Sequence, residues 1–206
     1  MCSIATRELV RNDQGMTERR AAETVDQRAD DLLHRMTLAE KAGMLFQTMI
    51  VVGSGDLAER NSTFRVASAE HMINSQLLTH FNVVRAAEDA WALADWHNRL
   101  QELAASTRLG IPITLSTDPR NHFTENVGTA ATAGSFSQWP ETLGLAAIGS
   151  YELVERFADI ARQEYLAVGL RLALHPQIDL ATEPRWSRIS GGFGEDADLA
   201  SALVQA

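Results

Sequence analysis

Side chains that suit one helix face recur at steps of three and four residues in two long stretches of the chain. In the first stretch, which Gly110 ends, that face is formed by Ala86, Ala90, Leu93, His97, Leu100 and Ala104. Ser150 can cap the second stretch, which Gly169 closes and whose face is formed by Leu153, Phe157, Ile160, Ala161 and Val168. We therefore expect each stretch to form one long helix.

Two short helices are predicted near the start of the chain. The apolar positions of residues 29–36 have a helical spacing. The sequence T-x-x-E of Thr37 and Glu40 then forms a capping box, in which hydroxyl and carboxylate accept hydrogen bonds from N–H groups at a helix start. A second helix is thus expected to run from there to about Gln47.

Capping residues and turn residues predict the rest of the helices and loops. The stretch "WPETLGLAAIG", residues 139–149, predicts a short helix, and Asp196 is suited to cap a last helix through "ADLASALVQA". Residues 53–67 and 118–138 are predicted loops, and residues 1–25 are a predicted polar arm without periodicity.

Compact apolar runs lie between the predicted helices. They predict buried strands at residues 77–84, 111–117 and 170–180, and a fourth strand near residues 49–52. Alternation of strand and helix is typical of a parallel α/β fold. No G-x-G-x-x-G sequence follows a strand, which disfavours the dinucleotide-binding version. A (β/α)8 TIM-type barrel takes about 250 residues, so we expect this chain to hold its first half.

Composition and charge narrow the function classes. The chain has 206 residues and a net charge of −9, whereas nucleic-acid-binding proteins carry basic surfaces. The chain has no run of about 18 apolar residues, the length that a membrane-spanning helix needs. Its N-terminus lacks the apolar core of a signal peptide, so a cytoplasmic location is expected. A single cysteine, Cys2, excludes an internal disulfide framework.

Charged residues gather in two loops that follow predicted strands. Asp118 comes directly after "IPITLST", and "TEPRWSRISGGFGED", residues 182–196, follows the run "LRLALHPQIDL". In a (β/α)8 barrel, the loops after the carboxyl ends of the strands carry the chemistry. Both loops therefore lie where a binding site is expected.

Several segments together resemble glycoside hydrolase family 3, the β-glucosidase family. They are "LLHRMTLAEKAGMLFQ", "RLGIPITLSTDPRNHF" and the long segment from "FSQWPETLG" to E-P-R-W-S-R and F-G-E-D. The resemblance covers about residues 30–206. Two positions depart from the family pattern, because Glu183 replaces the usual aspartate and Ser187 the usual glycine.

The resemblance implies an O-glycoside hydrolase that removes terminal β-D-glucosyl residues with retention, without a metal or another cofactor. Asp118 then corresponds to the aspartate that accepts hydrogen bonds from sugar hydroxyls, and Arg188 to the arginine that donates to the sugar. The nucleophile and the acid/base of the family lie beyond residue 206, the latter usually in a second domain. Residues 26–206 are therefore expected to be the truncated N-terminal part of a catalytic barrel and to be inactive alone. The expected binding partner is a small carbohydrate substrate.

Other interpretations of the two binding residues remain open. Asp118 can instead cap a turn before Pro119, and Arg188 can form an ion pair with Glu195 or Asp196. A β-N-acetylglucosaminidase of the same family is an alternative function, although "TDPRNHF" stands where those enzymes usually have Gln-Glu-Gly-Gly. A non-catalytic sugar-binding or inert fragment is another.

Neighbouring residues are given structural roles. Arg185 is expected to pair with a carboxylate of its own loop, and Trp186 to fill the underside of that loop rather than stack on a sugar. His122 and Glu125 are expected to lie on the Asp118 loop without touching the sugar. His175, Asp179 and Glu183 are spaced by four, but in a strand such residues lie about 13 Å apart, which disfavours a metal site.

Overall fold

The computed structural model describes residues 24–52, 56–62, 65–84, 89–123 and 134–206. It divides into two compact units, one up to Ala42 and one from Gly43 to Ala206. The predicted polar arm lies outside the described residues except for Thr24 and Val25, which belong to the start of a helix. None of the described helices has the length and apolar character needed to cross a bilayer.

The first helix, α2 (Val25–Arg35), begins earlier than predicted. Its start is fixed by a capping box, because the backbone N–H of Gln27 donates to Thr24 Oγ1 (3.2 Å) and that of Thr24 donates to Gln27 Oε1 (2.9 Å). The side-chain amide of Gln27 takes the place of the glutamate that is found in many capping boxes. Every residue of α2 is at least partly exposed, which explains why its apolar pattern was weak.

The second helix, α3 (Leu38–Met44), has the predicted cap. The N–H of Glu40 donates to Thr37 Oγ1 (3.2 Å), and the N–H of Thr37 donates to Glu40 Oε2 (2.7 Å). The prediction was wrong at the other end, because Gln47 belongs to a strand and not to this helix.

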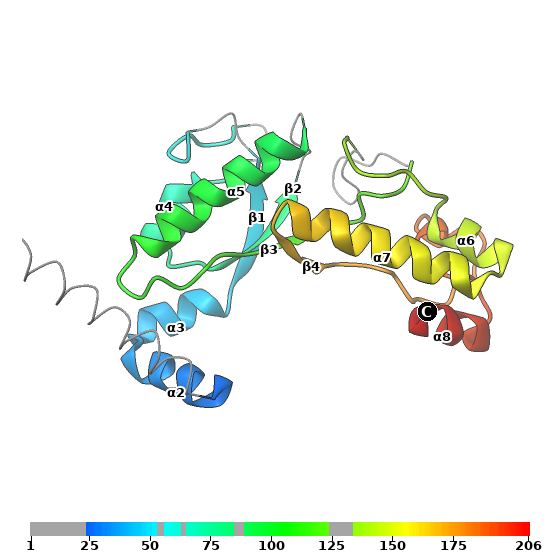
Figure 1. Ribbon diagram of the computed structural model, residues 1–206, viewed down its shortest axis with the longest axis horizontal. Helices are drawn as coiled ribbons and strands as arrows, with labels where there is room; N and C mark the ends of the chain where they lie inside the picture. Colours follow the sequence, from blue (N-terminus) through cyan, green and yellow to red (C-terminus); the bar gives the residue numbers. More distant parts are fainter. Residues whose placement is uncertain (1–23, 53–55, 63–64, 85–88, 124–133) are drawn as a thin grey trace, which may run out of the picture. The chain divides into compact units, whose positions relative to one another are not determined.

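Four parallel strands form one sheet in the order β1-β2-β3-β4 (Figure 1). They are β1 (Gln47–Val51), β2 (His80–Val84), β3 (Thr114–Thr117) and β4 (Leu170–Ala173). Strands in chain order, joined by helices, are the arrangement of a (β/α)8 barrel, and four strands are half of one. The predicted α/β class and half-barrel are confirmed.

The last strand is much shorter than the predicted strand 170–180. In the register of the sheet Ala173 pairs with Thr117, the last residue of β3, so beyond Thr117 no residue of β3 is left to pair with. One more bond follows, from the N–H of Leu174 to Thr117 O (2.9 Å), and Pro176 has no N–H to donate. The residues beyond β4 are irregular, and several apolar ones are exposed, among them Ile178 (59%).

The helices of this unit are α4 (Ala69–Asn74), α5 (Ala90–Ala105), α6 (Thr142–Ile148), α7 (Tyr151–Ala167) and α8 (Ala197–Gln205). Ser150 caps α7 and Asp196 caps α8, as predicted. Asp89 caps α5, where the prediction began at residue 86; residues 85–88 are outside the described part. Sequence reasoning missed α4, which is too short to show a period.

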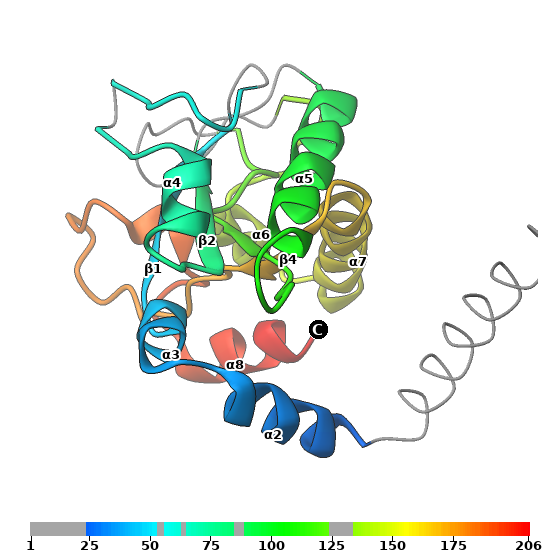
Figure 2. The same ribbon diagram turned by 90° about the vertical axis from the view of Figure 1, so that its left-hand side faces the viewer.

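Two hydrophobic clusters stabilise this unit. The larger one lies on one face of the sheet, against α4, α5 and the end of α7 (Figure 2), and contains Ile50, Phe81, Val83, Leu93, Trp96, Leu100 and Leu115. The smaller one joins α6, α7 and α8 through Leu145, Val154, Phe193, Ala200 and Leu203. Among the described residues, the helices α4, α5 and α7 thus cover one face of the sheet.

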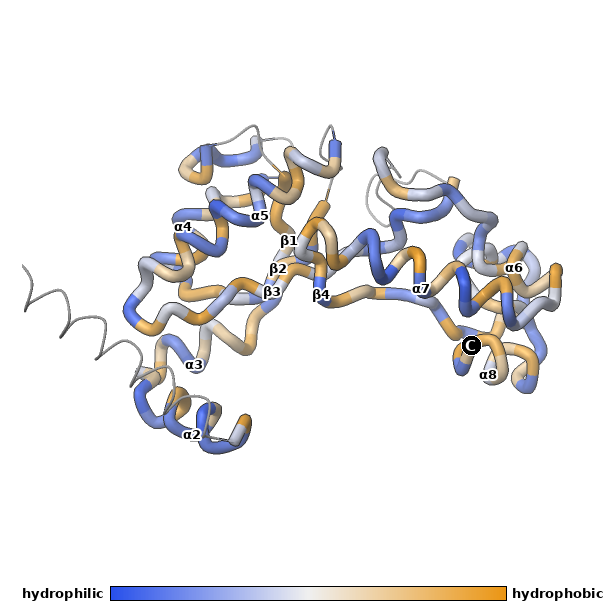
Figure 3. The backbone as a smooth tube through the Cα atoms, in the orientation of Figure 1, coloured by the Kyte–Doolittle hydropathy of each residue, from blue (hydrophilic) through white to orange (hydrophobic). Residues whose placement is uncertain are grey.

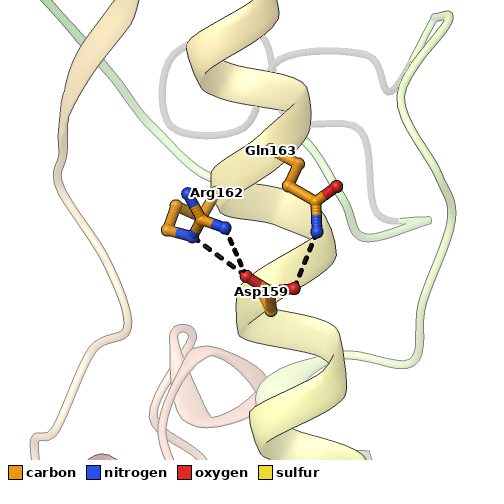
Figure 4. A network of polar contacts seen from close by, with 3 residues as sticks. All are labelled: Asp159, Arg162 and Gln163. Carbon is orange, nitrogen blue, oxygen red and sulfur yellow. Dashed lines mark hydrogen bonds and ion pairs between the residues drawn. The ribbon is translucent and has the colours of Figure 1, made fainter.

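Helix α7 belongs to both clusters, and hydrophobic and hydrophilic positions alternate along it (Figure 3). On its exposed side Asp159 accepts hydrogen bonds from Arg162 Nη2 (2.6 Å) and Gln163 Nε2 (2.7 Å), as Figure 4 shows. The Arg162 hydrogen bond, with help from Gln163, lowers the pKa of Asp159. These contacts lie within one helix, whereas the candidate site residues Asp118 and Arg188 lie in loops.

Candidate functional site

Asp118 lies directly after β3, at the carboxyl edge of the sheet, and is half-buried. Its Oδ2 accepts a hydrogen bond from Asn82 Nδ2 on the neighbouring strand (2.8 Å). The hydroxyl of Thr117 donates to the backbone carbonyl of Asp118 (2.8 Å). Within the described residues, the Asp118 carboxylate therefore bonds to a side chain across the sheet, instead of capping a backbone turn.

Asn82 belongs to a line of polar side chains that crosses three strands. Ser116 Oγ lies 3.0 Å from Asn82 Oδ1, and Gln47 Nε2 donates to Ser116 Oγ (2.8 Å). Sequence reasoning missed these three residues. The available signal was a polar residue at every second position at the start of β2 and β3, which places those polar groups on one face of the sheet, whereas β1 shows no such alternation.

Arg120 is a further residue that sequence reasoning missed, and it is fully buried (0% exposed). Its Nε donates to Thr117 Oγ1 (2.6 Å) and its Nη2 to the carbonyl of Val83 (3.0 Å). Burial lowers its pKa, while Tyr165 and Asp118 act in the opposite direction. The guanidinium thus joins the ends of β2 and β3 beneath the Asp118 loop.

Tyr165 connects Arg120 to His175. Its hydroxyl accepts a hydrogen bond from the backbone N–H of Arg120 (3.3 Å) and lies 3.0 Å from His175 Nε2, within hydrogen-bond distance of the imidazole. Burial raises the pKa of Tyr165 to about 12. Burial, with a smaller effect of His122, lowers the pKa of His175 to about 4, so this imidazole is neutral at pH 7.

The histidine of the Asp118 loop, His122, makes contacts that hold the loop in place. His122 is buried, and its Nδ1 donates to the carbonyl of Pro140 (2.8 Å). Its ring packs against Phe157, with 5.5 Å between the centroids. Glu125 lies outside the described residues. No three His, Cys, Asp or Glu side chains come together as a metal site in the described ranges.

Arg188 lies in the loop that follows β4, just before the short 3-10 turn η1 (Ile189–Gly191). Its guanidinium lies over the Trp186 ring, 5.0 Å from the centroid, and its Nη2 is 4.0 Å from Asp179 Oδ2. The ion pair considered from the sequence was with Glu195 or Asp196, whereas the structure records Asp179. Arg188 keeps 58% of its side chain exposed, so its N–H groups can reach a solvent-borne ligand.

The other residues of this loop hold its shape. Arg185 Nε and Nη2 donate to the two carboxylate oxygens of Glu183 (2.8 and 2.9 Å), which confirms the predicted pairing inside the loop. These hydrogen bonds lower the pKa of Glu183. Gly192 has no room for a side chain, because a Cβ there would lie 2.9 Å from the carbonyl of Asp179.

The loops that carry Asp118 and Arg188 begin at the same edge of the sheet, because β3 and β4 are parallel neighbours. Their convergence on one sugar stays a prediction. A pocket of about 310 Å³ lies elsewhere, between α7, β4 and α8, and is mostly apolar, with Phe157, Ala161, Leu170, Leu172, Phe193 and Leu203 in its wall. Asp118 and Arg188 are not part of this wall, and an apolar wall suits a sugar poorly.

Comparison with known proteins identifies a family. Residues 37–206 match the glycosyl hydrolase family 3 N-terminal domain. The chain is 53% identical over 198 residues to β-glucosidase C of Emericella nidulans, which covers 96% of the chain and 31% of that protein. It is 50% identical over 179 residues to a periplasmic β-glucosidase/β-xylosidase of Dickeya chrysanthemi, with 87% of the chain and 27% of that protein covered.

Solved structures have the same fold. A β-glucosidase of intestinal bacteria involved in saponin metabolism superimposes with a TM-score of 0.57 at 26% identity, over 89% of the chain and 20% of that structure. A family 3 β-N-acetylglucosaminidase from Paenibacillus sp. gives a TM-score of 0.60 at 22% identity, over 82% of the chain and 29% of that structure. The chain thus spans about a third or less of the length of these relatives.

Proposed function

Because the chain belongs to glycoside hydrolase family 3, we propose that it forms the N-terminal part of the catalytic barrel of a retaining β-glucosidase. Identity of about half to β-glucosidase C proteins supports this substrate class. Since the chain spans about 30% of their length, hydrolysis is proposed for the whole enzyme and not for residues 1–206 alone. A carbohydrate substrate follows from the family.

The observation that carries the proposal is the half-buried carboxylate of Asp118 at the carboxyl edge of the sheet. An ionised carboxylate has four lone-pair sites, and the Asn82 bond occupies one of them. Two adjacent sugar hydroxyls can then donate to the same group. Each such charge-assisted hydrogen bond contributes about 1.5–3 kcal/mol, enough to fix which hydroxyl pattern binds.

Arg188 complements this acceptor with donors. Its guanidinium carries N–H groups in a rigid plane, and contact with the Trp186 ring fixes the direction of that plane. We propose that it donates to the sugar and to the reacting carboxylates. Retaining enzymes need two carboxyl groups about 5 to 5.5 Å apart, and we propose that both lie beyond residue 206, one of them in a second domain.

The test joins residues 1–206 to the part of Emericella nidulans β-glucosidase C that follows its matched segment, and this product is called the joined enzyme. It is assayed with 4-nitrophenyl β-D-glucoside and β-D-xyloside. We expect hydrolysis of the glucoside with retention, and none by residues 1–206 alone. A folded joined enzyme that hydrolyses neither compound contradicts the proposed function.

A variant assigns the activity to the proposed site. Asp118→Asn turns two charge-assisted hydrogen bonds into neutral ones, a loss of about 1–1.5 kcal/mol each, so kcat/KM should fall by about 30-fold to 150-fold. Asp159→Asn is the matched control, because this aspartate is exposed and bonds only along α7 (Figure 4). Unchanged kcat/KM in Asp118→Asn would exclude Asp118 from the sugar site.

A further inference from the structure

The geometry points to Asn82 as a positioning residue for the Asp118 carboxylate, held in turn by Ser116 and Gln47. This inference rests on the function proposed above, because it treats Asp118 as the acceptor of sugar hydroxyls. Asn82 itself acts through Asp118 and is not assigned a contact with the substrate.

The register of the sheet brings the three polar residues to one face. Asn82 pairs directly with Ser116, and Gln47 lies one pleat earlier on β1, where its Cα partner is His80. The alternate residues, such as Phe81 and Leu115, point to the opposite face and are buried against the helices. All three amide and hydroxyl groups therefore lie on the face of the sheet opposite to the one that packs against α4 and α5.

Packing alone does not explain polar residues at these positions. The inward-facing positions of a (β/α)8 barrel are dominated by bulky branched side chains, and a buried polar group costs free energy unless it is hydrogen-bonded. Ser116 is nevertheless buried (3% exposed) and Asn82 is half-buried. Their hydrogen bonds to each other and to Asp118 account for them.

The carboxylate sets the direction of the whole line of hydrogen bonds. An ionised carboxylate only accepts, so the amide of Asn82 must turn its NH₂ to Asp118 and its Oδ1 to Ser116. The hydroxyl of Ser116 then donates to Asn82 Oδ1 and accepts from Gln47 Nε2. The amide of Asn82 thus has one orientation, whereas the Ser116 hydroxyl also lies 3.3 Å from the carbonyl oxygen of Phe81.

A neutral donor suits this position. Asn82 holds one oxygen of the carboxylate in place and leaves its negative charge intact, so the remaining lone pairs stay strong acceptors. Thr117 meanwhile holds the backbone carbonyl of Asp118. Sugar contacts depend on placement to about 0.5 Å, so a carboxylate free to rotate should bind its hydroxyls more weakly.

The experiment compares Asn82→Ala and Asn82→Asp in the joined enzyme. Asn82→Ala removes the donor, and kcat/KM for the glucoside should fall about tenfold to a hundredfold, with KM taking most of the change. In Asn82→Asp the introduced carboxyl group donates to Asp118 when it is protonated and repels it when it is ionised. Two carboxyl groups this close repel each other when both are ionised, so the pair keeps one proton to a higher pH than a single aspartate does. The KM of Asn82→Asp should therefore be nearest that of the parent at the acid end of the profile and rise steeply towards pH 8.

The pH profile separates positioning from a structural role, because a damaged fold would not recover in acid. Among the described residues, the charged or titratable groups near Asn82 and Asp118 are Arg120 and Tyr165, which both interact with Asp118, and His80, two residues before Asn82 on β2. These groups are present in parent and variant alike, so the difference between the two pH profiles of KM isolates the new carboxyl group. Asn74→Asp is the matched control, because Asn74 is an exposed residue at the end of α4.

The outcomes distinguish this inference from the proposed function. An inactive but folded parent would overturn the proposed function. An active parent that Asp118→Asn disables, together with Asn82→Ala within twofold of the parent, would overturn the positioning role alone. A KM profile of Asn82→Asp that parallels the parent would do the same.

Discussion

Replacement of Gly169 by alanine should destabilise the chain strongly, because two independent costs meet at this residue. Gly169 lies between α7 and β4 with φ of +84°, a region that residues with a Cβ rarely adopt. A Cβ at this position would also overlap the ring of His97 on α5. The ring has little freedom to move, because His97 Nε2 lies 2.8 Å from Gln101 Nε2, and Gln101 is bonded to the backbone of Ile113.

The magnitude follows from separating the two costs. The left-handed conformation costs an alanine about 1–2 kcal/mol, and overpacking of a filled site adds about 1–3 kcal/mol, so Gly169→Ala should lose about 2–5 kcal/mol. Gly110→Ala measures the first cost alone, because Gly110 has φ of +60° and its nearest neighbour to a Cβ is 3.7 Å away. We expect about 1–2 kcal/mol for that control.

The assay is urea unfolding of the dilute purified chain, followed by circular dichroism at two protein concentrations. With a slope of about 2 kcal/mol per molar urea, Gly169→Ala should lower the midpoint by about 1–2.5 M. Adding His97→Ala removes the obstacle, so the double variant should be about 1–3 kcal/mol more stable than the sum of the single losses predicts. A Gly169→Ala loss no larger than that of Gly110→Ala, or additive losses in the double variant, would refute the reasoning.

Two further predictions concern pH and turnover. The pKa of His175 is lowered to about 4 from about 6.5 in the unfolded chain, so the unfolded state binds more protons between these values and stability should fall by up to about 3 kcal/mol as the pH drops from 6.5 to 4. His175→Gln, which keeps an acceptor for Tyr165, should flatten this slope in urea titrations, and an unchanged slope would show that another group is responsible. Residues 1–206 alone should release no nitrophenol from the glucoside, whereas hydrolysis that purifies with the chain and disappears in Asp118→Asn would place the reacting carboxylates inside it.

The starts of α3, α7 and α8 could be predicted from the sequence because their causes are local. Thr37 and Glu40 satisfy each other's neighbouring backbone groups within one turn, and Ser150 and Asp196 accept from N–H groups no more than three residues away. The half-barrel class was predictable for a related reason, since alternating apolar periods specify which segments can bury a face. The cytoplasmic location stays a prediction.

Site residues were predictable only where a motif named them. Asp118 and Arg188 came from resemblance, whereas Asn82 and Arg120 belong to no motif. Asn82 gains its meaning from Asp118, which lies thirty-six residues further along the chain. Only the sheet register brings these two side chains within hydrogen-bond distance.

The sequence by itself determined the caps of α3, α7 and α8, the faces of the long helices and the segments that form strands, because those depend on neighbours one to four residues apart. The tertiary structure alone decided that β4 stops at Ala173, since a strand lasts only as far as its neighbour β3 offers backbone partners. It also decided that Arg188 faces Asp179 and Trp186. Contacts between distant segments depend on how the whole sheet is assembled, and no local pattern of side chains encodes that assembly.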